Sequence, residues 1–217
     1  MMSSDLRRIR SKDREAWEKS RGIGIGGSDA SAILGISPWM SSVDLWKIKT
    51  GEQKQKDLSD NELVQRGHDL EEPLRNLFMS MHKELTLEYH AYDQLYQDGR
   101  EWLFVTLDGE LTEIKTGRKG LLEVKTSSPI GKSGWEKWDG RIPDNYLAQV
   151  YHALLATGFE FAYLFAALFG SNENITLRTY YIERQDVEDD LRWLLSEEES
   201  FWQHVQNRTM PPMKLVL

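Results

Sequence analysis

The chain has 217 residues, with 27 Lys or Arg against 35 Asp or Glu and therefore a net charge of −8. A chain of this length can bury enough apolar surface to fold without staples, and the absence of cysteine excludes disulfides, thiol nucleophiles, Cys-ligated zinc and iron–sulfur clusters. The longest apolar run, residues 161–169, is well short of the roughly 20 residues needed to cross a membrane, and the N-terminus lacks an apolar signal region. We therefore expect a cytoplasmic protein with no membrane partner.

The first part of the chain, about residues 1–83, is predicted to be helical. Periodicity and capping residues indicate four helices, at 14–20, 28–34, 41–50 and 62–82. Ser28 is expected to cap the second helix, Ser41 or Ser42 to start the third, and Gly35 and Gly51 to end them. Apolar residues at helical spacing predict that the fourth helix buries one face: Leu63, Leu70, Leu74, Leu77, Phe78 and Met81.

After Leu85 the pattern changes to period two, which is typical of strands. The elements predicted from there are strands at 85–92, 102–111 and 119–126, a helix that Asp144 caps and Gly158 ends, a buried strand at 161–169, a partner strand at 175–183 and a terminal helix capped by Asp186. This order predicts an α/β (α+β) fold with a central mixed sheet flanked by helices. We expect one domain over 1–217, with a sheet-containing core at about 84–184 and a C-terminal helix at about 186–207.

A glycine-rich segment, residues 22–27, lies between the first two predicted helices. It has the G-x-G-x-x-G spacing of dinucleotide sites, but a charged helix rather than a buried strand precedes it. Two interpretations remain: a flexible turn, or a turn whose free N–H groups bind a phosphate beside Arg21 and Ser28. Residues 1–21 carry a net +3 and residues 114–141 a net +4, which is compatible with phosphate binding but is equally typical of solvated faces.

Asp108, Glu123 and Lys125 form the pattern that most strongly indicates chemistry. Glu123 and Lys125 are two positions apart, so their side chains leave the same face of a strand, whereas Val124 points into the core. A turn around residues 116–118 would bring Asp108 beside Glu123. Two close carboxylates favour a cation, and hard oxygen ligands suit Mg²⁺ or Mn²⁺. A lysine beside them can help to orient or deprotonate water, which is the chemistry of phosphodiester hydrolysis.

The same pattern also occurs on exposed strand faces, where Glu and Lys form cross-strand pairs. In this chain the strand has the apolar residues of a buried one, because Leu121, Leu122 and Val124 surround the two charges. Burying unpaired charges is costly without a function. The pattern therefore favours a functional site over a surface pair.

Five ordered motifs resemble those of the YqaJ-type viral recombinase family, the group that includes phage lambda exonuclease. They are Trp17 with residues 21–30, residues 67–73, Leu107-Asp108-Gly109, residues 122–126 and residues 146–150. The resemblance runs from about Trp17 to Arg184. It implies a restriction-endonuclease-like PD-(D/E)xK nuclease core that uses Mg²⁺, with Mn²⁺ as a possible substitute.

The resemblance also implies a role for each matching residue. Asp108, Glu123 and Val124 would hold the metal ion, and Lys125 would be the catalytic lysine. Glu71 matches an acidic helix residue at the metal site, and Gln149 matches a glutamine that closes the motif on the next helix. Arg21 and Ser28 match the two residues that hold the 5′ phosphate. Glu71 and Gln149 also fit ordinary roles, as a solvent-facing residue and a local hydrogen-bonding group.

Two positions depart from the family pattern. Leu107 replaces the proline of the name-giving motif, which puts little in doubt. Lys132 is a candidate for the basic residue that similar enzymes place on the terminal phosphate, in a segment that does not align cleanly.

Trp135 and Trp138 fit either stacking on single-stranded DNA or plain packing. The five histidines show no metal-ligand spacing and are expected to be structural or exposed: His68, His82, His90, His152 and His204.

The function implied is a Mg²⁺-dependent 5′-to-3′ exonuclease that resects one strand of linear double-stranded DNA in phage or prophage recombination. It would leave a 3′ overhang for a single-strand annealing protein. Members similar to this chain form ring-shaped trimers around DNA, so a homotrimer is expected. Two alternatives stay open: a structure-specific or restriction-like endonuclease of the same fold, and a catalytically dead DNA-binding accessory, against which the filled Asp, Glu and Lys positions speak.

Overall fold

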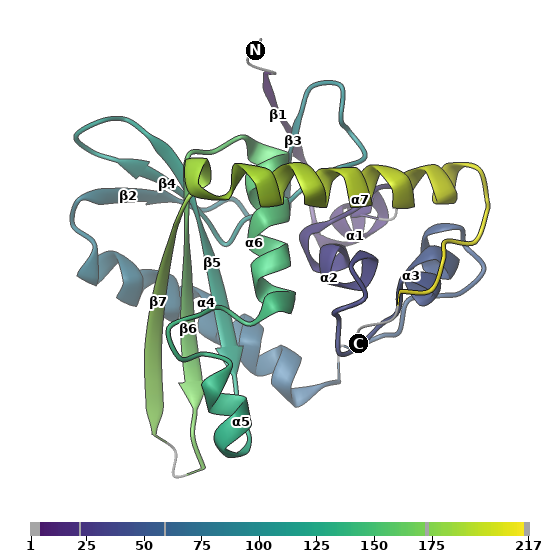
Figure 1. Cartoon of the computed structure of the whole chain (residues 1–217). Coiled ribbons are helices and arrows are strands. Elements are labelled where there is room, and N and C mark those ends of the chain that lie inside the picture. Colours follow the sequence, from purple (N-terminus) through teal and green to yellow (C-terminus); the bar gives the residue numbers. More distant parts are fainter. Residues whose placement is uncertain (1–4, 22, 59, 172–173, 215–217) are drawn as a thin grey trace.

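The computed structural model describes residues 5–21, 23–58, 60–171 and 174–214 (Figure 1). In chain order the elements are β1 (Leu6–Arg10), α1 (Arg14–Arg21), a first 3-10 turn (Gly27–Asp29), α2 (Ala30–Ile33), α3 (Ser42–Lys49), α4 (Glu62–Met81), β2 (Leu85–Glu88), β3 (Asp93–Gln97), β4 (Gly109–Glu113), β5 (Lys119–Ser127), α5 (Gly131–Glu136), α6 (Asp144–Thr157), β6 (Phe161–Phe169), β7 (Ile175–Glu183), a second 3-10 turn (Arg184–Val187) and α7 (Glu188–Gln206). Within the described ranges, each helix is too short or too polar to cross a membrane.

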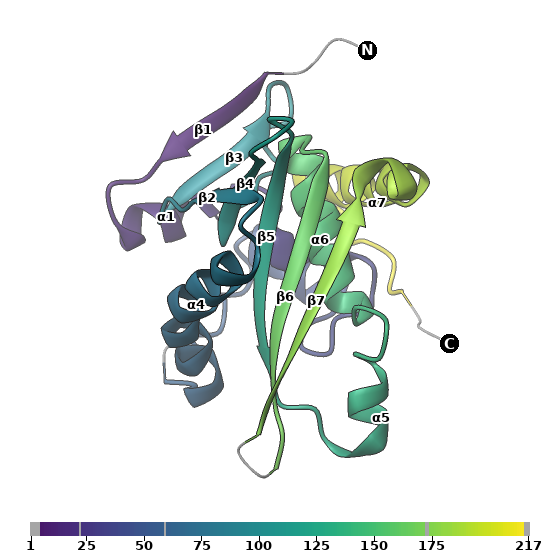
Figure 2. The ribbon, with the colours of Figure 1, turned by 90° about the vertical axis from the view of Figure 1, so that its left-hand side faces the viewer.

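A five-stranded sheet forms the centre of the molecule, with strand order β2-β4-β5-β6-β7. β5 and β6 run parallel, and the other neighbouring strands run antiparallel. Figure 2 shows α4 on one face of the sheet and α6 on the other, with β1 and β3 paired as a separate two-stranded sheet. The predicted central mixed sheet flanked by helices is therefore confirmed.

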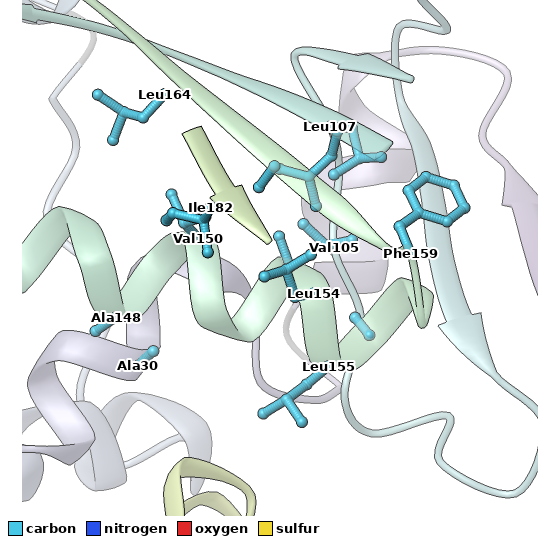
Figure 3. Close-up of a cluster of buried hydrophobic side chains, with 14 of the residues drawn as sticks. Ala30, Val105, Leu107, Ala148, Val150, Leu154, Leu155, Phe159, Leu164 and Ile182 are labelled. Atoms are coloured by element: carbon cyan, nitrogen blue, oxygen red, sulfur yellow. The ribbon is translucent and has the colours of Figure 1, made fainter. Parts of the chain in front are cut away.

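The sheet separates two hydrophobic cores. On the α6 side, Val150 and Leu154 of the helix pack with Leu164 of β6 and Ile182 of β7, as the labelled side chains in Figure 3 show. On the α4 side, the core contains residues of that helix together with residues of β5 and β6: Leu74, Phe78, Leu122, Val124, Phe165 and Ala167. Strands covered on both faces are rich in apolar residues, which is why the run 161–169 forms the buried strand β6.

β5 positions the residues of interest because its side chains alternate between the two cores. Val124 packs into the core on the α4 side, and Leu121 packs into the core on the α6 side. Glu123 and Lys125 share the parity of Leu121 and therefore lie on the α6 side. Parallel pairing of β5 with the fully covered β6 fixes this register.

The N-terminal segment differs from the helical prediction, because residues Leu6–Arg10 form β1. This strand pairs antiparallel with β3, which lies far away in the sequence. The sequence of β1 does not alternate between apolar and polar residues. Ion pairs hold the strand instead, because Arg8 contacts Asp93 at 2.8 Å and Glu110 at 2.6 Å. Local periodicity does not reveal a strand that is held by a distant partner.

Two of the predicted strands have the wrong bounds. The strand expected over 102–111 begins only at Gly109, and the segment before it makes two isolated bridges, Leu103 to Ile25 and Val105 to Leu95. The strand expected over 85–92 ends at Glu88, and β3 was not predicted. Residues 103–107 alternate because they insert into the core, not because their backbone belongs to a continuous ladder.

Three predicted helix caps are wrong, and one is confirmed. Ser28 lies inside the first 3-10 turn, where the Asp29 carboxylate accepts a hydrogen bond from the N–H of Gly26. Neither Asp144, which follows Pro143, nor Asp186, which lies in the second 3-10 turn, caps its helix. The predicted cap of α3 is present, since the hydroxyl of Ser41 accepts from the N–H of Asp44. Positive φ angles occur at the three expected helix-ending glycines: Gly35, Gly51 and Gly158.

α4 spans the predicted range but buries a narrower face. Leu74 and Phe78 are buried, whereas the predicted core residues Leu63, Leu77 and Met81 are 63%, 39% and 54% exposed. The stripe that faces the sheet also carries a charged residue, Arg75, which is buried. The apolar stripe read from the sequence is therefore wider than the surface that β5 and β6 cover.

Candidate active site

Asp108 lies at the entry to β4, directly before the residue that pairs with β5. The antiparallel register places Gly109 opposite Leu122, so Asp108 reaches the level of Glu123 and Val124. Its carboxylate accepts a hydrogen bond of 2.8 Å from the N–H of Val124. This bond fixes Asp108 against the backbone of the strand that carries the other predicted catalytic residues.

Glu123 and Lys125 form an ion pair of 2.5 Å on the α6 side of β5. Glu123 is 2% exposed, and α6 contributes its second polar partner, because the side-chain amide of Gln149 donates to the Glu123 carboxylate at 2.6 Å. The ammonium of Lys125 also lies 5.5 Å from the ring centre of Tyr146. The structure thus brings four of the sequence-predicted residues together: Asp108, Glu123, Lys125 and Gln149.

Burial dominates the electrostatics of this cluster. It raises the pKa of Glu123 to about 7, where Lys125 opposes the rise and Asp108 adds to it. Burial also raises the pKa of Asp108, against the lowering effect of Lys125. For Lys125, burial by itself would lower the pKa, but the Glu123 and Asp108 carboxylates outweigh it and raise the pKa. Loss of hydration, rather than repulsion between the carboxylates, is therefore the main reason that the pKa values of Glu123 and Asp108 are raised, and Lys125 offsets only part of it.

Glu71 approaches the cluster from α4. Burial raises its pKa, and Asp108 adds to the rise, while His68 and Arg75 lower it. His68 lies 3.2 Å from the Glu71 carboxylate, and the buried guanidinium of Arg75 lies 3.8 Å from the ring centre of Tyr89. Glu71 is therefore electrostatically part of the site, although the structure gives it a histidine partner rather than a direct bond to Asp108.

The donor set fits a hard divalent cation by its chemistry. Asp108, Glu123 and Glu71 offer carboxylate oxygens, which Mg²⁺ and Mn²⁺ prefer, and their raised pKa values show that added positive charge would be favourable. In the described part of the chain, no group of three or more acidic or histidine side chains stands at metal-ligand spacing. The Glu123 carboxylate is instead engaged by Lys125 and Gln149.

The predicted phosphate turn is the glycine-rich segment 22–27 together with the 3-10 turn that leads into α2, and Gly27 borders Gln149 of α6. Its first glycine, Gly22, is outside the described residues. The Arg21 guanidinium stacks on the ring of Trp17 at 4.5 Å, and the indole N–H of Trp17 donates to the Thr106 hydroxyl at 2.9 Å. Ser28 is exposed in the first 3-10 turn. Both predicted phosphate-binding side chains are thus held by short elements next to the predicted catalytic segment.

Lys49 of α3 has a buried side chain that binds two residues of this turn and its flank. The ammonium of Lys49 forms an ion pair of 2.7 Å with Asp29, and their side chains are 8% and 18% exposed. It also donates to the backbone carbonyl of Arg21 at 3.4 Å. Because Asp29 in turn accepts from the N–H of Gly26 at 2.9 Å, one cation joins both ends of the segment that carries Arg21 and Ser28.

Glycines let the turn approach the catalytic elements closely. A Cβ on Gly24 would lie 2.4 Å from the carbonyl oxygen of Trp102, and a Cβ on Gly27 would lie 3.1 Å from Cγ of Gln149. The N–H of Ile25 donates to the same Trp102 carbonyl at 2.6 Å. The turn therefore contacts the residue that hydrogen-bonds Glu123, so the two predicted sites are neighbours.

Sequence reasoning missed four residues of this neighbourhood: His68, Arg75, Asp29 and Lys49. Helical spacing could have indicated the first two, since His68 lies three positions before Glu71 and Arg75 four positions after it. The Lys49–Asp29 pair had no local signal, because its partners lie on different elements.

The predicted tryptophans, Lys132 and the buried histidine are not among the residues that contact Glu123 or Asp108 in the described part of the chain. Trp138 is 3% exposed and packs in the core, so stacking on DNA is wrong for it, whereas Trp135 is half-buried. Lys132 is 91% exposed, 3.6 Å from Glu136. Of the histidines, His152 is structural as expected: it is fully buried against Glu198 at 2.7 Å.

Comparison with known proteins agrees with the motifs. A family model described as YqaJ-like viral recombinase domain matches residues 16–160. The protein YqaJ of Bacillus subtilis (strain 168), described as uncharacterised, is 32% identical over 197 residues. The match covers 87% of this chain and 55% of YqaJ, so the chain spans about half the length of this curated relative.

Two solved structures share the architecture. The alkaline exonuclease LHK-Exo of Laribacter hongkongensis has a TM-score of 0.68 at 16% identity, over 90% of this chain and 94% of that one. A phage related exonuclease of Haemophilus somnus 129PT has a TM-score of 0.54 at 15% identity, over 85% and 96% of the two chains. At these identities the likeness shows a common fold, which agrees with the predicted central mixed sheet flanked by helices.

Proposed function

The chain belongs to the YqaJ-like viral recombinase family, and from this premise we propose that it is a Mg²⁺-dependent exonuclease. It resects linear double-stranded DNA from the 5′ end and leaves a 3′ overhang. The observation that carries the proposal is the convergence on β5, where Asp108 accepts from the N–H of Val124 and Glu123 pairs with Lys125. Fold and family agree with a phage-type exonuclease.

The proposed roles follow from the contacts. Asp108, Glu123 and the backbone carbonyl of Val124 would hold the metal ion, since the Val124 side chain is packed in the core. The ion would lower the pKa of water and offset negative charge on the phosphate. Lys125 orients the attacking water and balances charge that grows on the phosphate. Gln149 holds the Glu123 carboxylate in place through its 2.6 Å hydrogen bond, and Glu71 adds negative charge from α4.

Polarity would come from the phosphate turn. Arg21 and Ser28 are proposed to bind the terminal 5′ phosphate, with the guanidinium already oriented by Trp17 at 4.5 Å. The turn contacts Gln149, so a phosphate bound there lies next to the cleavage centre. A local positive charge at this phosphate site also explains how a chain with a net charge of −8 can bind DNA.

The proposed setting is phage or prophage recombination in the bacterial cytoplasm. The 3′ overhang would pass to a single-strand annealing protein, and three copies of the chain would form a ring around the DNA. These assignments rest on membership of the family, and the chain covers about half the length of the curated relative YqaJ.

The decisive experiment is digestion of linear duplex with and without a 5′ phosphate, in Mg²⁺ or in chelator, with each strand labelled in turn. We expect loss of the 5′-terminated strand, faster digestion of phosphorylated ends and no digestion in chelator. Loss of the strand from its 3′ end, or cleavage in chelator, would contradict the proposal.

Circular duplex and a site variant complete the test. An end-dependent enzyme leaves closed circles intact, so their cleavage would favour the endonuclease alternative. Asp108→Ala, Glu123→Ala and Lys125→Ala are each expected to abolish digestion while the protein stays folded. Digestion equal to that of the wild type in any of them would remove that residue from the mechanism.

A further inference from the structure

A cavity of about 720 Å³ opens beyond the catalytic end of β5. Its lining comes from the start of α4, the segment after β5, α5 and the end of β6, and includes Arg66, Ser128, Ile130, Trp135, Phe169 and Gly170. Figure 1 shows α5 beside these strand ends. The predicted catalytic and phosphate-binding residues do not contribute to this lining, so the cavity is a separate site.

Arg66 gives the cavity a fixed positive charge. Its guanidinium lies 4.4 Å from the ring centre of Phe169 and donates to the Ser128 hydroxyl at 2.9 Å. Over the described residues, no carboxylate forms an ion pair with Arg66, and its Nε is buried without a hydrogen-bond partner. An oriented guanidinium without a counter-charge is suited to bind a phosphate.

The other side of the cavity is apolar. Trp135 is half-buried, and Ile130 is 88% exposed. Gly170 borders the Trp135 ring, since a Cβ there would lie 3.7 Å from it, an ordinary contact. Aromatic rings beside a cation are typical of sites for unpaired nucleotides, because a base stacks on the ring while its phosphate meets the charge.

Two elements connect the cavity to the cleavage centre. Ser128 follows Lys125 by three positions, which is about 10 Å along a strand. Arg66 precedes Glu71 by five positions on α4, which is about 7.5 Å along a helix. Both distances correspond to about two or three nucleotides at a rise of ~3.4 Å per nucleotide.

We propose that this cavity binds one unpaired nucleotide of single-stranded DNA, with its phosphate on Arg66 and its base against Trp135. The inference rests on the proposed function, because the uncut strand becomes single-stranded as its partner is removed. A released mononucleotide shares this chemistry, but its terminal phosphate carries a second charge, and Arg66 is the one cation among the described lining residues. An internal phosphodiester, with one charge, matches that lining.

The test measures DNA binding by fluorescence anisotropy in EDTA, which prevents metal-dependent cleavage. The probes are a duplex with a 3′ overhang of six thymidines, the same duplex with blunt ends, and free dTMP as a competitor. Arg66→Met keeps an unbranched side chain beside Phe169 and removes the charge. We expect it to weaken overhang binding about tenfold, to reduce the salt slope by about 0.7 and to leave blunt binding unchanged.

A second variant and a control make the result specific. Trp135→Leu leaves Arg66 in place and is expected to weaken overhang binding about fivefold or more. Arg192→Met removes an exposed arginine of α7, which pairs with Asp189, and should change neither probe. Thermal melting verifies that each variant is folded, and Trp135→Leu decides the matter if Arg66→Met does not fold.

The outcomes separate the cavity from the proposed function. Equal losses on blunt and overhang probes, or no loss in either variant, would overturn the nucleotide site. Efficient displacement of the overhang by dTMP would overturn the assignment to a DNA strand in favour of a product site. Wild-type protein that fails to digest linear duplex in Mg²⁺ but shows the Arg66-dependent overhang binding would refute the exonuclease and support the site.

Discussion

Glu123 has requirements for stability and function that conflict. Its carboxylate is 2% exposed, and burial raises its pKa to about 7 from an ordinary 4.5. Folding therefore takes up a proton between these pH values, so this residue's contribution to stability is present below pH 4.5 and is lost as the pH rises through 7. Above that pH, the metal-free protein carries a buried charge whose direct polar partners, among the residues that the structure describes, are Lys125 and Gln149.

Glu123→Gln is therefore expected to abolish cleavage and, at the same time, to stabilise the metal-free protein. The amide keeps the shape of the side chain but removes the charge. In EDTA its melting temperature should exceed that of the wild type at pH 8 and differ less at pH 5, as measured by thermal denaturation. Glu101→Gln, at an exposed position, is the control. A variant that melts below the wild type at pH 8 would show that the charge of Glu123 is stabilising.

Helix α3 contacts the predicted phosphate turn through one side chain. Lys49 pairs with Asp29 at 2.7 Å and bonds the carbonyl of Arg21 at 3.4 Å. Removing one partner of such a covered pair leaves the other charge unsatisfied. The geometry of the turn, and not only its composition, therefore depends on a neighbouring helix.

Lys49→Met is expected to reduce the preference for 5′-phosphorylated ends about tenfold. The reason is that the turn loses its anchor although Arg21 and Ser28 remain. The ratio of kcat/KM on phosphorylated and hydroxyl ends measures the effect, and Lys47→Met on the same helix is the control. In an Arg21→Ala background, the Lys49 substitution should change this ratio no further; additive effects would show that Lys49 acts elsewhere.

Strand pairing between β5 and β6 depends on a glycine. A Cβ on Gly120 would lie 2.2 Å from the Phe161 ring, which covers the glycine in the register Gly120 to Phe161. Gly120→Ala is thus expected to lower the free energy of unfolding by about 2 kcal/mol through overpacking, as measured by urea denaturation.

Two further variants test this explanation. Phe161→Leu should restore part of the stability in the Gly120→Ala background, because it removes the clashing ring. Gly67→Ala, within α4, places its Cβ 3.5 Å from the Thr126 hydroxyl, an ordinary contact, and is expected to be stabilising by about 0.5–1 kcal/mol. No rescue by Phe161→Leu would place the strain elsewhere.

A buried ion pair and a hydrogen bond join three segments that are distant in the sequence. His152 of α6 faces Glu198 of α7 at 2.7 Å and the carbonyl of Phe104 at 2.9 Å. Both neighbours are acceptors, so the ring carries a proton on each nitrogen. Burial by itself would lower the pKa of His152, but Glu198 outweighs it and raises the pKa above 6.5.

The contribution of this pair to stability is present below pH 6.5 and is lost as the pH rises through the raised pKa of His152. Glu198→Gln is therefore expected to cost about 3 kcal/mol at pH 6 and less at pH 9. Urea denaturation at both pH values measures the difference. A cost that is independent of pH would show that the histidine is neutral in the native protein.

The overall charge of −8 bears on how the protein stays on DNA. If three copies enclose the duplex, processivity arises from topology and does not need many phosphate contacts. The length digested per binding event should then change little between 50 and 200 mM salt, whereas a binder with six to ten phosphate contacts loses about 10³–10⁵ in affinity. Tract lengths that shorten as steeply as that, or a monomeric mass in light scattering, would contradict enclosure.

Much of the architecture was predictable because it has a local cause. The apolar run 161–169 predicts a strand covered on both faces, and the alternation around Glu123 predicts which side chains share a face. Serine or glycine at helix ends predicts the start and end of α3. β1 was not predictable, since its charged residues are matched by partners on β3 and β4.

The family, the order of most elements and the residue types of the site can be read from the amino-acid order, since motifs and periodicity depend on neighbours a few positions apart. Packing brings about the hydrogen bond between Asp108 and the strand of Glu123, the ion pair between Lys49 and Asp29, and the contact of Arg66 with Phe169. These contacts join residues from separate elements. Their energies depend on burial and on the distance between charges, which exist only once the chain has packed.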